Sequence, residues 1–319
     1  MLAGHEQPWR EWHAALAGPR LHHGWILAGR RGVGKAAFAM QAARELVAEP
    51  GVAQPHGDHA DIIVLTHLPK DDKEEAKRAD GKPFELKRNI TVDQVRAMQQ
   101  RLTTRPTLGS RRVVLIDPAD DLERSAANAL LKSLEEPPAG TFFLLVAHRL
   151  GRLLPTIRSR CRVLPFPRIE DGEIDAILRR EAPQTEEAVR AAAIAAANGS
   201  PGAALEFVEL DLGEIHRLMG EIADHGDPDF ARRGRLAEAM GARPDRQRQL
   251  AAVDLARAVV AGRMESTPRG AIPALSDTHA ELVRLAAQAP TYNFDAGLLV
   301  MEIGTLLASI ARPRAAADG

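Results

Sequence analysis

A glycine-rich segment directly follows the first apolar run of the chain and constrains the fold more than any other feature. The run is Trp25–Leu27, and the segment after it reads Gly29-Arg30-Arg31-Gly32-Val33-Gly34-Lys35. Glycines let successive backbone N–H groups turn toward one anion, a following helix N-terminus adds a favourable dipole, and a lysine adds positive charge. The sequence therefore predicts a buried strand, a helix beginning near Ala36, and between them a phosphate loop formed by Gly29, Gly32, Gly34 and Lys35.

The same loop lacks the side chain that would hold Mg²⁺. That side chain is normally a Ser or Thr hydroxyl directly after the lysine, and here the position is Ala36. A second apolar run, Val113–Ile116, ends in Asp117, as expected of a parallel strand that carries a carboxylate to its C-terminal edge. Hydrolysis would need another carboxylate beside Asp117 to polarise water, and Pro118 occupies that position. A second interpretation is that Asp117 only caps the next helix.

A short loop after a third apolar run, Phe142–Val146, carries an arginine between small residues. The loop ends in Ser159-Arg160-Cys161. Arginine keeps its charge and has five donors, so it suits the neutralisation of charge on a transferred phosphoryl group, including one held by another subunit. Taken alone, Arg160 is better explained as a solvent-exposed loop residue. Its position after a phosphate loop and a strand aspartate favours the catalytic interpretation.

Two longer stretches make the pattern specific. They are Asn128–Pro138, which ends in a double proline that stops a helix, and Leu153–Cys161. Together with the phosphate loop they resemble the bacterial clamp-loader branch of the AAA+ family, and within it the delta-prime family of DNA polymerase III subunits. The resemblance implies an α/β fold followed by an all-α part: an AAA+ parallel-sheet domain with a phosphate loop over 1–167, a small helical lid over 168–208, and a C-terminal helical collar domain for oligomerisation over 209–319.

The departures from this branch point to a chain that does not hydrolyse ATP by itself. The catalytic members, gamma and tau, keep a hydroxyl after the lysine, acids after the strand aspartate, a polar γ-phosphate sensor and a nucleotide-sensing arginine. Those positions here are Ala36, Pro118, Ala147 and Gly202. The resemblance thus implies a pseudo-ATPase whose relic loop binds nucleotide weakly or not at all. It also implies that Arg160, with Ser159, acts in trans on an adjacent ATPase subunit.

The resemblance further implies the partners. The chain would help load a sliding clamp onto primed DNA during replication, as a cytoplasmic component of the polymerase III holoenzyme, a nucleotidyltransferase (transferase) complex. Its neighbours would be the tau/gamma and delta subunits, and ATP and Mg²⁺ would be bound by partners. Many relatives carry a four-cysteine zinc module, but Cys161 is the single cysteine here, so we expect no zinc, no other metal and no internal disulfide.

Two other functions remain open at this stage. A catalytically competent AAA+ clamp-loader ATPase would turn over nucleotide as a lone chain. A small-molecule kinase with a phosphate loop would phosphorylate a metabolite, but it would have no use for the helical third domain or for the Ser-Arg-Cys loop.

Composition agrees with a helix-rich complex component. Of the 319 residues, 45% are hydrophobic and only 4% aromatic, which predicts alanine-packed cores in two or three domains. No run approaches 18 apolar residues and no secretory pattern opens the chain, so we expect no membrane contact. Net charge is +7 over 1–168 and −8 over 169–319, which is a weak signal for nucleic acid.

The remaining patterns have structural interpretations. Pro69–Arg88 is a charged run that predicts a solvated loop, with DNA or partner contact as the alternative. Apolar helical patterns near Val253–Val260 and Leu298–Leu307 offer more apolar surface than a lone helical domain would bury, which favours a collar interface. Strands are expected at Trp25–Ala28, Ile62–Thr66, Val113–Ile116, Phe142–Val146 and Arg162–Leu164. Core or surface roles, and not metal or DNA binding, are expected for His56, Asp58, His59, Asp61, Trp9, Trp12 and Trp25.

Overall fold

The chain divides into two compact units, Met1–Arg168 and Ile169–Gly319. The computed structural model describes residues 4–264, 267–288 and 295–311. The first unit contains the sheet, and helices form the second. The division of the second unit into a lid over 168–208 and a collar over 209–319 stays a prediction.

Five parallel strands form the sheet of the first unit. They pair in the order β2-β3-β4-β1-β5, which places β1 between β4 and β5. Each strand lies within one residue of its expected ends, so the strand predictions are confirmed. The bounds are Gly24–Ala28 for β1, Ile62–Leu65 for β2, Arg112–Ile116 for β3, Thr141–Ala147 for β4 and Arg162–Pro165 for β5.

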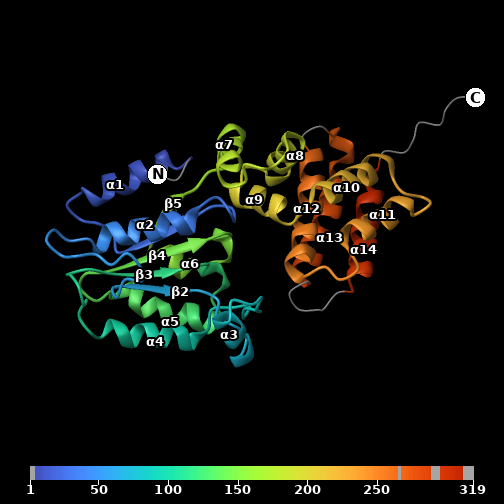
Figure 1. Cartoon of the computed structure of the whole chain (residues 1–319). Helices are drawn as coiled ribbons and strands as arrows, with labels where there is room; N and C mark the ends of the chain where they lie inside the picture. Colours follow the sequence, from blue (N-terminus) through green and yellow to red (C-terminus); the bar gives the residue numbers. More distant parts are fainter. Residues whose placement is uncertain (1–3, 265–266, 289–294, 312–319) are drawn as a thin grey trace, which may run out of the picture. The chain divides into compact units, whose positions relative to one another are not determined.

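Helices cover both faces of this sheet (Figure 1). Because side chains alternate along a strand, Trp25 and Leu27 pack with α1 and α2, whereas Ile26 packs with α4 and α5. Trp9, Trp12 and Trp25 are buried, so their core assignment is confirmed. The helices are α1 (Glu6–Leu16), α2 (Lys35–Val47), α3 (Asp72–Ala79), α4 (Val92–Leu102), α5 (Arg124–Glu135) and α6 (Pro155–Arg158), with short 3-10 turns at Ala119–Asp121 and Leu150–Arg152.

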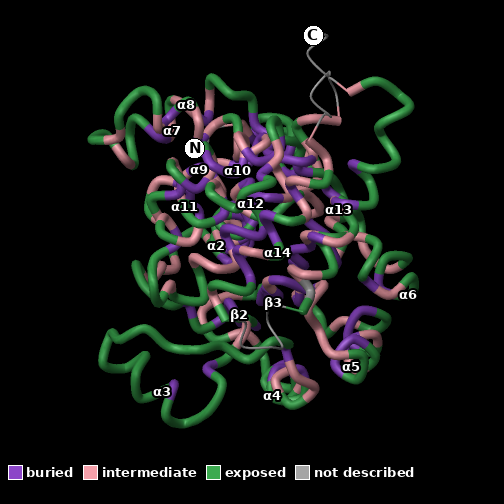
Figure 2. Tube along the Cα trace, turned by 90° about the vertical axis from the view of Figure 1, so that its right-hand side faces the viewer, coloured by how far each residue is buried: buried purple, intermediate pink, exposed green. Residues whose placement is uncertain are grey.

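The charged run Pro69–Arg88 is exposed for most of its length, but it is not only a loop (Figure 2). It contains α3, whose N-terminus is capped where the Asp71 carboxylate accepts the Glu74 N–H at 3.0 Å. Glu74 is buried and accepts the Glu85 N–H at 2.6 Å, which ties the helix to the returning chain. The loop prediction was therefore wrong for α3. Its few apolar residues left no helical pattern, and its stabilising contacts are polar.

The metal-like spacing around Asp61 serves the fold instead. Both Asp61 oxygens accept backbone N–H groups, from Thr107 and Leu108, at 2.7 Å, and one also lies 3.4 Å from the Arg112 guanidinium. Burial alone would raise the pKa of Asp61, but these N–H groups and Arg112 hold the pKa below its ordinary value. Asp61 therefore anchors the loop before β3 as a carboxylate.

The second unit is built around one hydrophobic cluster that runs from Ile169 to Leu307. Most of the apolar residues expected at a collar interface lie inside this cluster, among them Val253, Val260 and Ile303, while Leu298 is 71% exposed. Excess apolar surface predicted that these residues lie at a collar interface, and for most of them this prediction was wrong because they are buried in the unit itself. The helices are α7 (Asp171–Glu181), α8 (Glu187–Ala197), α9 (Pro201–Glu209), α10 (Gly213–His225), α11 (Ala231–Met240), α12 (Arg246–Met264), α13 (Ile272–Gln288) and α14 (Ala296–Ser309), with a 3-10 turn at Arg269–Ala271.

A buried arginine of α11, Arg233, forms an ion pair with Asp227 and a hydrogen bond to α14. The Arg233 Nε donates to Asp227 at 3.0 Å, and its Nη1 donates to the Thr305 hydroxyl at 3.1 Å. The Arg233 stem passes over Gly304, where an added Cβ would lie 2.4 Å from Cγ and 2.7 Å from Cδ. The guanidinium is bonded at its far end, so the stem has little freedom to move aside.

We expect Gly304→Ala to destabilise the protein by about 1–3 kcal/mol, because the methyl group overpacks against the Arg233 stem. Gly234→Ala is the matched control: it lies on exposed α11 with open space around it and should stabilise by about 0.5–1 kcal/mol. Urea unfolding of both variants measures the difference. Equal stabilisation by the two substitutions would contradict the packing argument.

Candidate functional site

The residues singled out from the sequence lie at two opposite edges of the sheet. The glycine-rich loop follows β1 at the C-terminal edge, and Arg160 precedes β5 at the N-terminal edge. The register places Trp25 beside Arg162 and Ala28 beside Pro165. Strands rise about 3.3 Å per residue, so the step from Trp25 to Gly29 spans roughly 13 Å. The two groups are therefore separate sites.

The phosphate loop has the backbone that its glycines predict. Gly32 and Gly34 have φ of 79° and 95°, a region that side-chain-bearing residues seldom adopt. A Cβ on Gly34 would lie 2.8 Å from the His5 Nε2, and one on Gly29 would lie 2.5 Å from the Phe166 carbonyl oxygen. The structure brings Gly29, Gly32, Gly34 and Lys35 together in one loop at the start of α2.

Lys35 is turned back into this loop. It is 2% exposed, and its Nζ donates to the carbonyls of Gly29 at 2.7 Å and Arg30 at 2.5 Å. On the other side, the buried His5 ring donates from Nε2 to the Val33 carbonyl at 2.5 Å. The loop carbonyls are thus bonded by two side chains of the chain itself. His5 gave no sequence signal, because its contact with Val33 joins residues that are distant in the chain.

Two acidic groups that follow β3, Asp117 and Asp120, lie near the lysine. Burial lowers the pKa of Lys35 from 10.5 to about 8, although the charges of Asp117 and Asp120 oppose the shift. Burial also raises the pKa of Asp117, against the charge of Lys35. Asp120 accepts the backbone N–H groups of His148 at 2.8 Å and Arg149 at 3.1 Å, so it holds the loop after β4 in place.

His148 is a polar residue near the loop that the sequence reading missed. It follows Ala147, the position that lacks the expected sensor side chain, and its Nδ1 is buried without a hydrogen-bond partner. Burial and the charge of Lys35 lower the pKa of His148 to about 4, so the ring is neutral near pH 7. Only its position directly after Ala147 could have drawn attention to it.

The glycine-rich loop at this edge is suited to binding an anion. The loop presents N–H groups and one amine, but Ala36 and Pro118 supply no side-chain oxygen. One loop N–H, that of Gly29, is already bonded to the Ala147 carbonyl at 3.2 Å. Within residues 4–264, 267–288 and 295–311, no group of three or more His, Cys, Asp or Glu side chains is placed to hold a metal.

Arg160 lies on a short loop after α6, whose first residue is Pro155. The Arg160 Nη1 donates to the Thr156 carbonyl at 2.9 Å and lies 3.4 Å from the Ser159 hydroxyl. Its Nη2 forms an ion pair with Glu135, the last residue of α5. The Arg160 side chain is 33% exposed. The structure therefore places Ser159 beside Arg160, as expected, and adds Glu135 as an unforeseen partner.

The loop is held against the start of β1. A Cβ on Gly24 would lie 2.9 Å from the Cys161 Sγ, so the glycine permits close packing of the Arg160–Cys161 backbone. Burial raises the pKa of the Cys161 thiol to about 12, which keeps the thiol protonated. His23 Nε2 donates to the Leu134 carbonyl at 2.9 Å and ties the end of α5 to the same edge.

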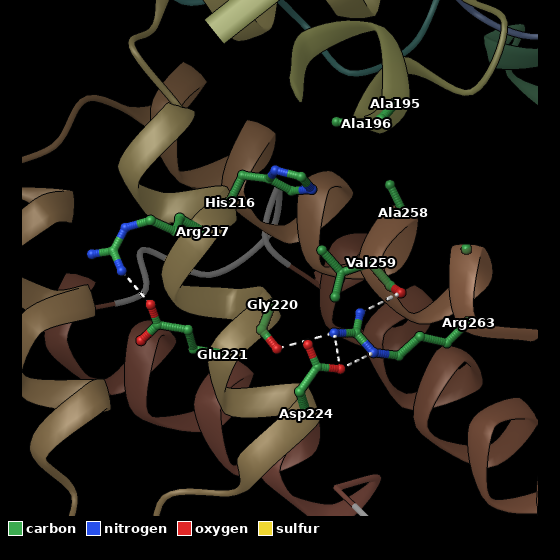
Figure 3. Close-up of a pocket in the computed structure, with 11 residues that line it drawn as sticks. Ala195, Ala196, His216, Arg217, Gly220, Glu221, Asp224, Ala258, Val259 and Arg263 are labelled. Atoms are coloured by element: carbon green, nitrogen blue, oxygen red, sulfur yellow. Dashed lines mark hydrogen bonds and ion pairs between the residues drawn. The ribbon is translucent and has the colours of Figure 1, made fainter. Parts of the chain in front are cut away.

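A pocket of about 460 Å³ opens in the second unit between α8, α10 and α12 (Figure 3). Its charged side chains are paired with each other: Arg263 with Asp224 at 2.8 Å, and Arg217 with Glu221. His216 also lines the pocket. Its pKa is lowered mainly by burial and, to a smaller extent, by the charge of Arg263. Alanines and Val259 line the rest, so the pocket offers no concentrated charge or reactive group.

We expect the Lys35 amine to titrate near pH 8, because burial disfavours its charged form. The chain has seven lysines, so a ¹³Cε-lysine NMR titration resolves them, and Lys35→Met assigns the signal. The pKa of Lys35 is lower in the folded chain than in the unfolded chain. Between about pH 8 and 10.5 the unfolded chain therefore binds more protons. In that range this group makes the free energy of unfolding rise with pH. A Lys35 midpoint near 10.5 would contradict the buried geometry.

The sequence is similar to those of DNA polymerase III subunits. Residues 4–170 match the model of the family described as DNA polymerase III, delta subunit. The delta' subunit of DNA polymerase III from Pseudomonas aeruginosa is 37% identical over 177 residues, which are 50% of this chain and 49% of that protein. The delta' subunit from Escherichia coli K12 is 41% identical over 146 residues, 46% of this chain and 43% of that protein. The chain thus spans about half the length of these curated relatives.

A solved structure extends the likeness of fold over both units. The DNA polymerase III gamma subunit-related protein from Thermotoga maritima covers 96% of this chain and 100% of its own, with a TM-score of 0.50 and 17% identity. This likeness and the parallel sheet confirm the expected fold class, an α/β part followed by an all-α part. Because the family model matches half of the sequence, including the phosphate loop and the Ser-Arg-Cys loop, the chain belongs to the family described as DNA polymerase III, delta subunit.

Proposed function

We propose that the chain is the delta-prime subunit of a DNA polymerase III clamp loader, that it does not hydrolyse ATP itself, and that it supplies Arg160 to an ATP site on a neighbouring subunit. The observation that carries the proposal is the position of Arg160. It lies at the edge of the sheet opposite to its own phosphate loop, where its guanidinium contacts Thr156 and Glu135. A phosphate that Arg160 neutralises from there belongs to another chain.

The state of the chain's own loop supports the non-hydrolysing part. Lys35, which would bind the β- and γ-phosphates, is bonded to two carbonyls of the loop. Hydrolysis also needs a metal ligand and a water-polarising carboxylate, and those positions are Ala36 and Pro118. Backbone N–H groups alone can still bind a simple anion.

The proposed partners follow from the family. We expect tau/gamma and delta subunits as neighbours, with ATP and Mg²⁺ bound by those neighbours, and contact with the sliding clamp and primed DNA through the complex. The helices over 209–319 would form its collar, and the lid over 168–208 would join collar and AAA+ domain. The chain would work in the cytoplasm as part of the polymerase holoenzyme; in the described part of the chain, no helix is both long and apolar enough to cross a membrane.

The lone chain should bind ATP weakly or not at all and should not hydrolyse it. Isothermal titration calorimetry with ATP, with and without Mg²⁺, together with a phosphate-release assay, measures both properties. Micromolar affinity that depends on Mg²⁺, or turnover above background, would favour a catalytically competent ATPase instead. Sulfate or phosphate binding would leave the proposal intact, because the helix N-terminus and the N–H groups bind anions without a metal.

Arg160→Ala should lower the ATPase activity and clamp loading of a reconstituted complex that carries the change in this chain alone. Arginines that act in trans contribute roughly 10³–10⁵ in rate, and the loss across the complex is smaller because other sites continue to work. Arg160→Lys should rescue poorly, since an ammonium lacks the planar fork. Stability should change by about 1 kcal/mol or less, because the pair with Glu135 is partly exposed.

Arg158→Ala is the matched control for this experiment. Arg158 is exposed, lies two residues away on α6, and makes no side-chain ion pair within the described residues, so its loss removes the same charge without touching Glu135. Assembly is checked by size-exclusion chromatography of each complex. Full activity of an assembled Arg160→Ala complex would refute the role in trans.

A further inference from the structure

The ion pair between Arg160 and Glu135 occupies donors that the proposed function needs. Nη2 contacts the Glu135 carboxylate, and Nη1 donates to the Thr156 carbonyl at 2.9 Å. Arginine recognises a phosphate through two parallel N–H···O bonds, which commonly involve these nitrogens. In the conformation described here, both Nη atoms are therefore engaged within the chain.

Glu135 lies at the C-terminus of a helix, where an acidic side chain is least favourable. It is the last residue of α5, and Glu136 follows it as the C-cap. The C-terminus of a helix carries partial negative charge, so carboxylates there are unfavourable and cations are favourable. Arg160 supplies the compensating positive charge from a different element, α6 and the loop after it. A sequence that breaks a local rule in this way often does so at a functional position.

The surroundings hold both partners at a fixed spacing. The end of α5 is tied to the start of β1 by the bond from His23 to the Leu134 carbonyl, and the Arg160 backbone packs against Gly24. The two ends of the ion pair are thus anchored on the same edge of the sheet. The side chains themselves are freer, with Glu135 48% and Arg160 33% exposed.

We propose that Glu135 is a positioning residue that keeps Arg160 docked on its own α5 until the phosphate of a neighbouring subunit displaces the carboxylate. The inference rests on the proposed role of Arg160 in trans. An ion pair of this exposure shifts an equilibrium by at most about fivefold, so the restraint is weak enough for a phosphate to overcome. Glu135 therefore favours the inactive position of Arg160 and suppresses hydrolysis while neighbouring subunits are poorly aligned.

The test compares Glu135→Gln with Glu136→Gln in the reconstituted complex. Glu136 is the matched control, since it is exposed, adjacent, equally charged and without an ion pair among the described residues. We expect Glu135→Gln to raise ATPase activity about two- to fivefold in the absence of clamp and primed DNA. The ratio should approach one when both are present, because Arg160 is then already engaged. Glu136→Gln should match the unchanged protein under both conditions.

A double variant and a measurement on the lone chain separate the possible failures. Glu135→Gln combined with Arg160→Ala should behave as Arg160→Ala alone, because Glu135 acts through the arginine. In the lone chain, Glu135→Gln should speed the rotation of the Arg160 guanidinium in ¹⁵N NMR, whereas Glu136→Gln should not.

Each outcome has a defined meaning. Unchanged or lower ATPase activity in Glu135→Gln, or an equal rise in Glu136→Gln, overturns the restraint. A third outcome is that Arg160→Ala leaves ATPase activity intact while Glu135→Gln still speeds the rotation of the Arg160 guanidinium. The role of Arg160 in trans and the restraint by Glu135 would then both be refuted, but the contact between the two residues would stand. If the NMR signal of Arg160 is the same in both Gln variants, the contact itself is overturned.

Discussion

The parallel pairing of β1 with β4 on one side and β5 on the other is the constraint on which the rest of this structure depends. It places the end of β1, where the glycine-rich loop begins, beside the ends of β4 and β5. It also places the start of β1 beside the loop that carries Arg160. Two loops far apart in the sequence thus become fixed features of opposite edges of the sheet.

At the C-terminal edge, side chains of the chain itself bind the backbone of the glycine-rich loop and of the loop after β4. Lys35 bonds the loop carbonyls, His5 bonds Val33, and Asp120 holds the backbone after β4. A buried lysine without such partners would be costly, so these contacts stabilise the loop without a bound nucleotide. The same contacts use groups that an ATP site would direct at the phosphates.

At the N-terminal edge, the polar side chains of Arg160 and Glu135 are more exposed than those of Lys35 and His5 at the other edge. Arg160 is partly exposed, and its ion pair with Glu135 contributes little to stability. Its backbone, in contrast, is held by the partly buried Cys161 and by the close approach of Gly24. The base of the side chain is therefore fixed, while its charged end is partly exposed.

Much of this organisation could be predicted from the sequence alone. The five strands, the phosphate loop and the core role of the three tryptophans depend on local patterns of apolar and glycine residues, which act over a few positions. Helix α3 was missed because its contacts are polar, and the apolar residues of α12 and α14 were assigned to a surface because periodicity does not say what a helix packs against.

The sequence by itself thus determined the elements, the family and the residues that a nucleotide site would need or lack, because each is written in one short segment. Only the tertiary structure decided where those segments meet. The burial of Lys35, the contact of His5 with the loop, the placement of His148 and the pairing of Glu135 with Arg160 join residues distant along the chain. Such contacts are set by the order of strands in the sheet and by the packing of its helices, which no local pattern specifies.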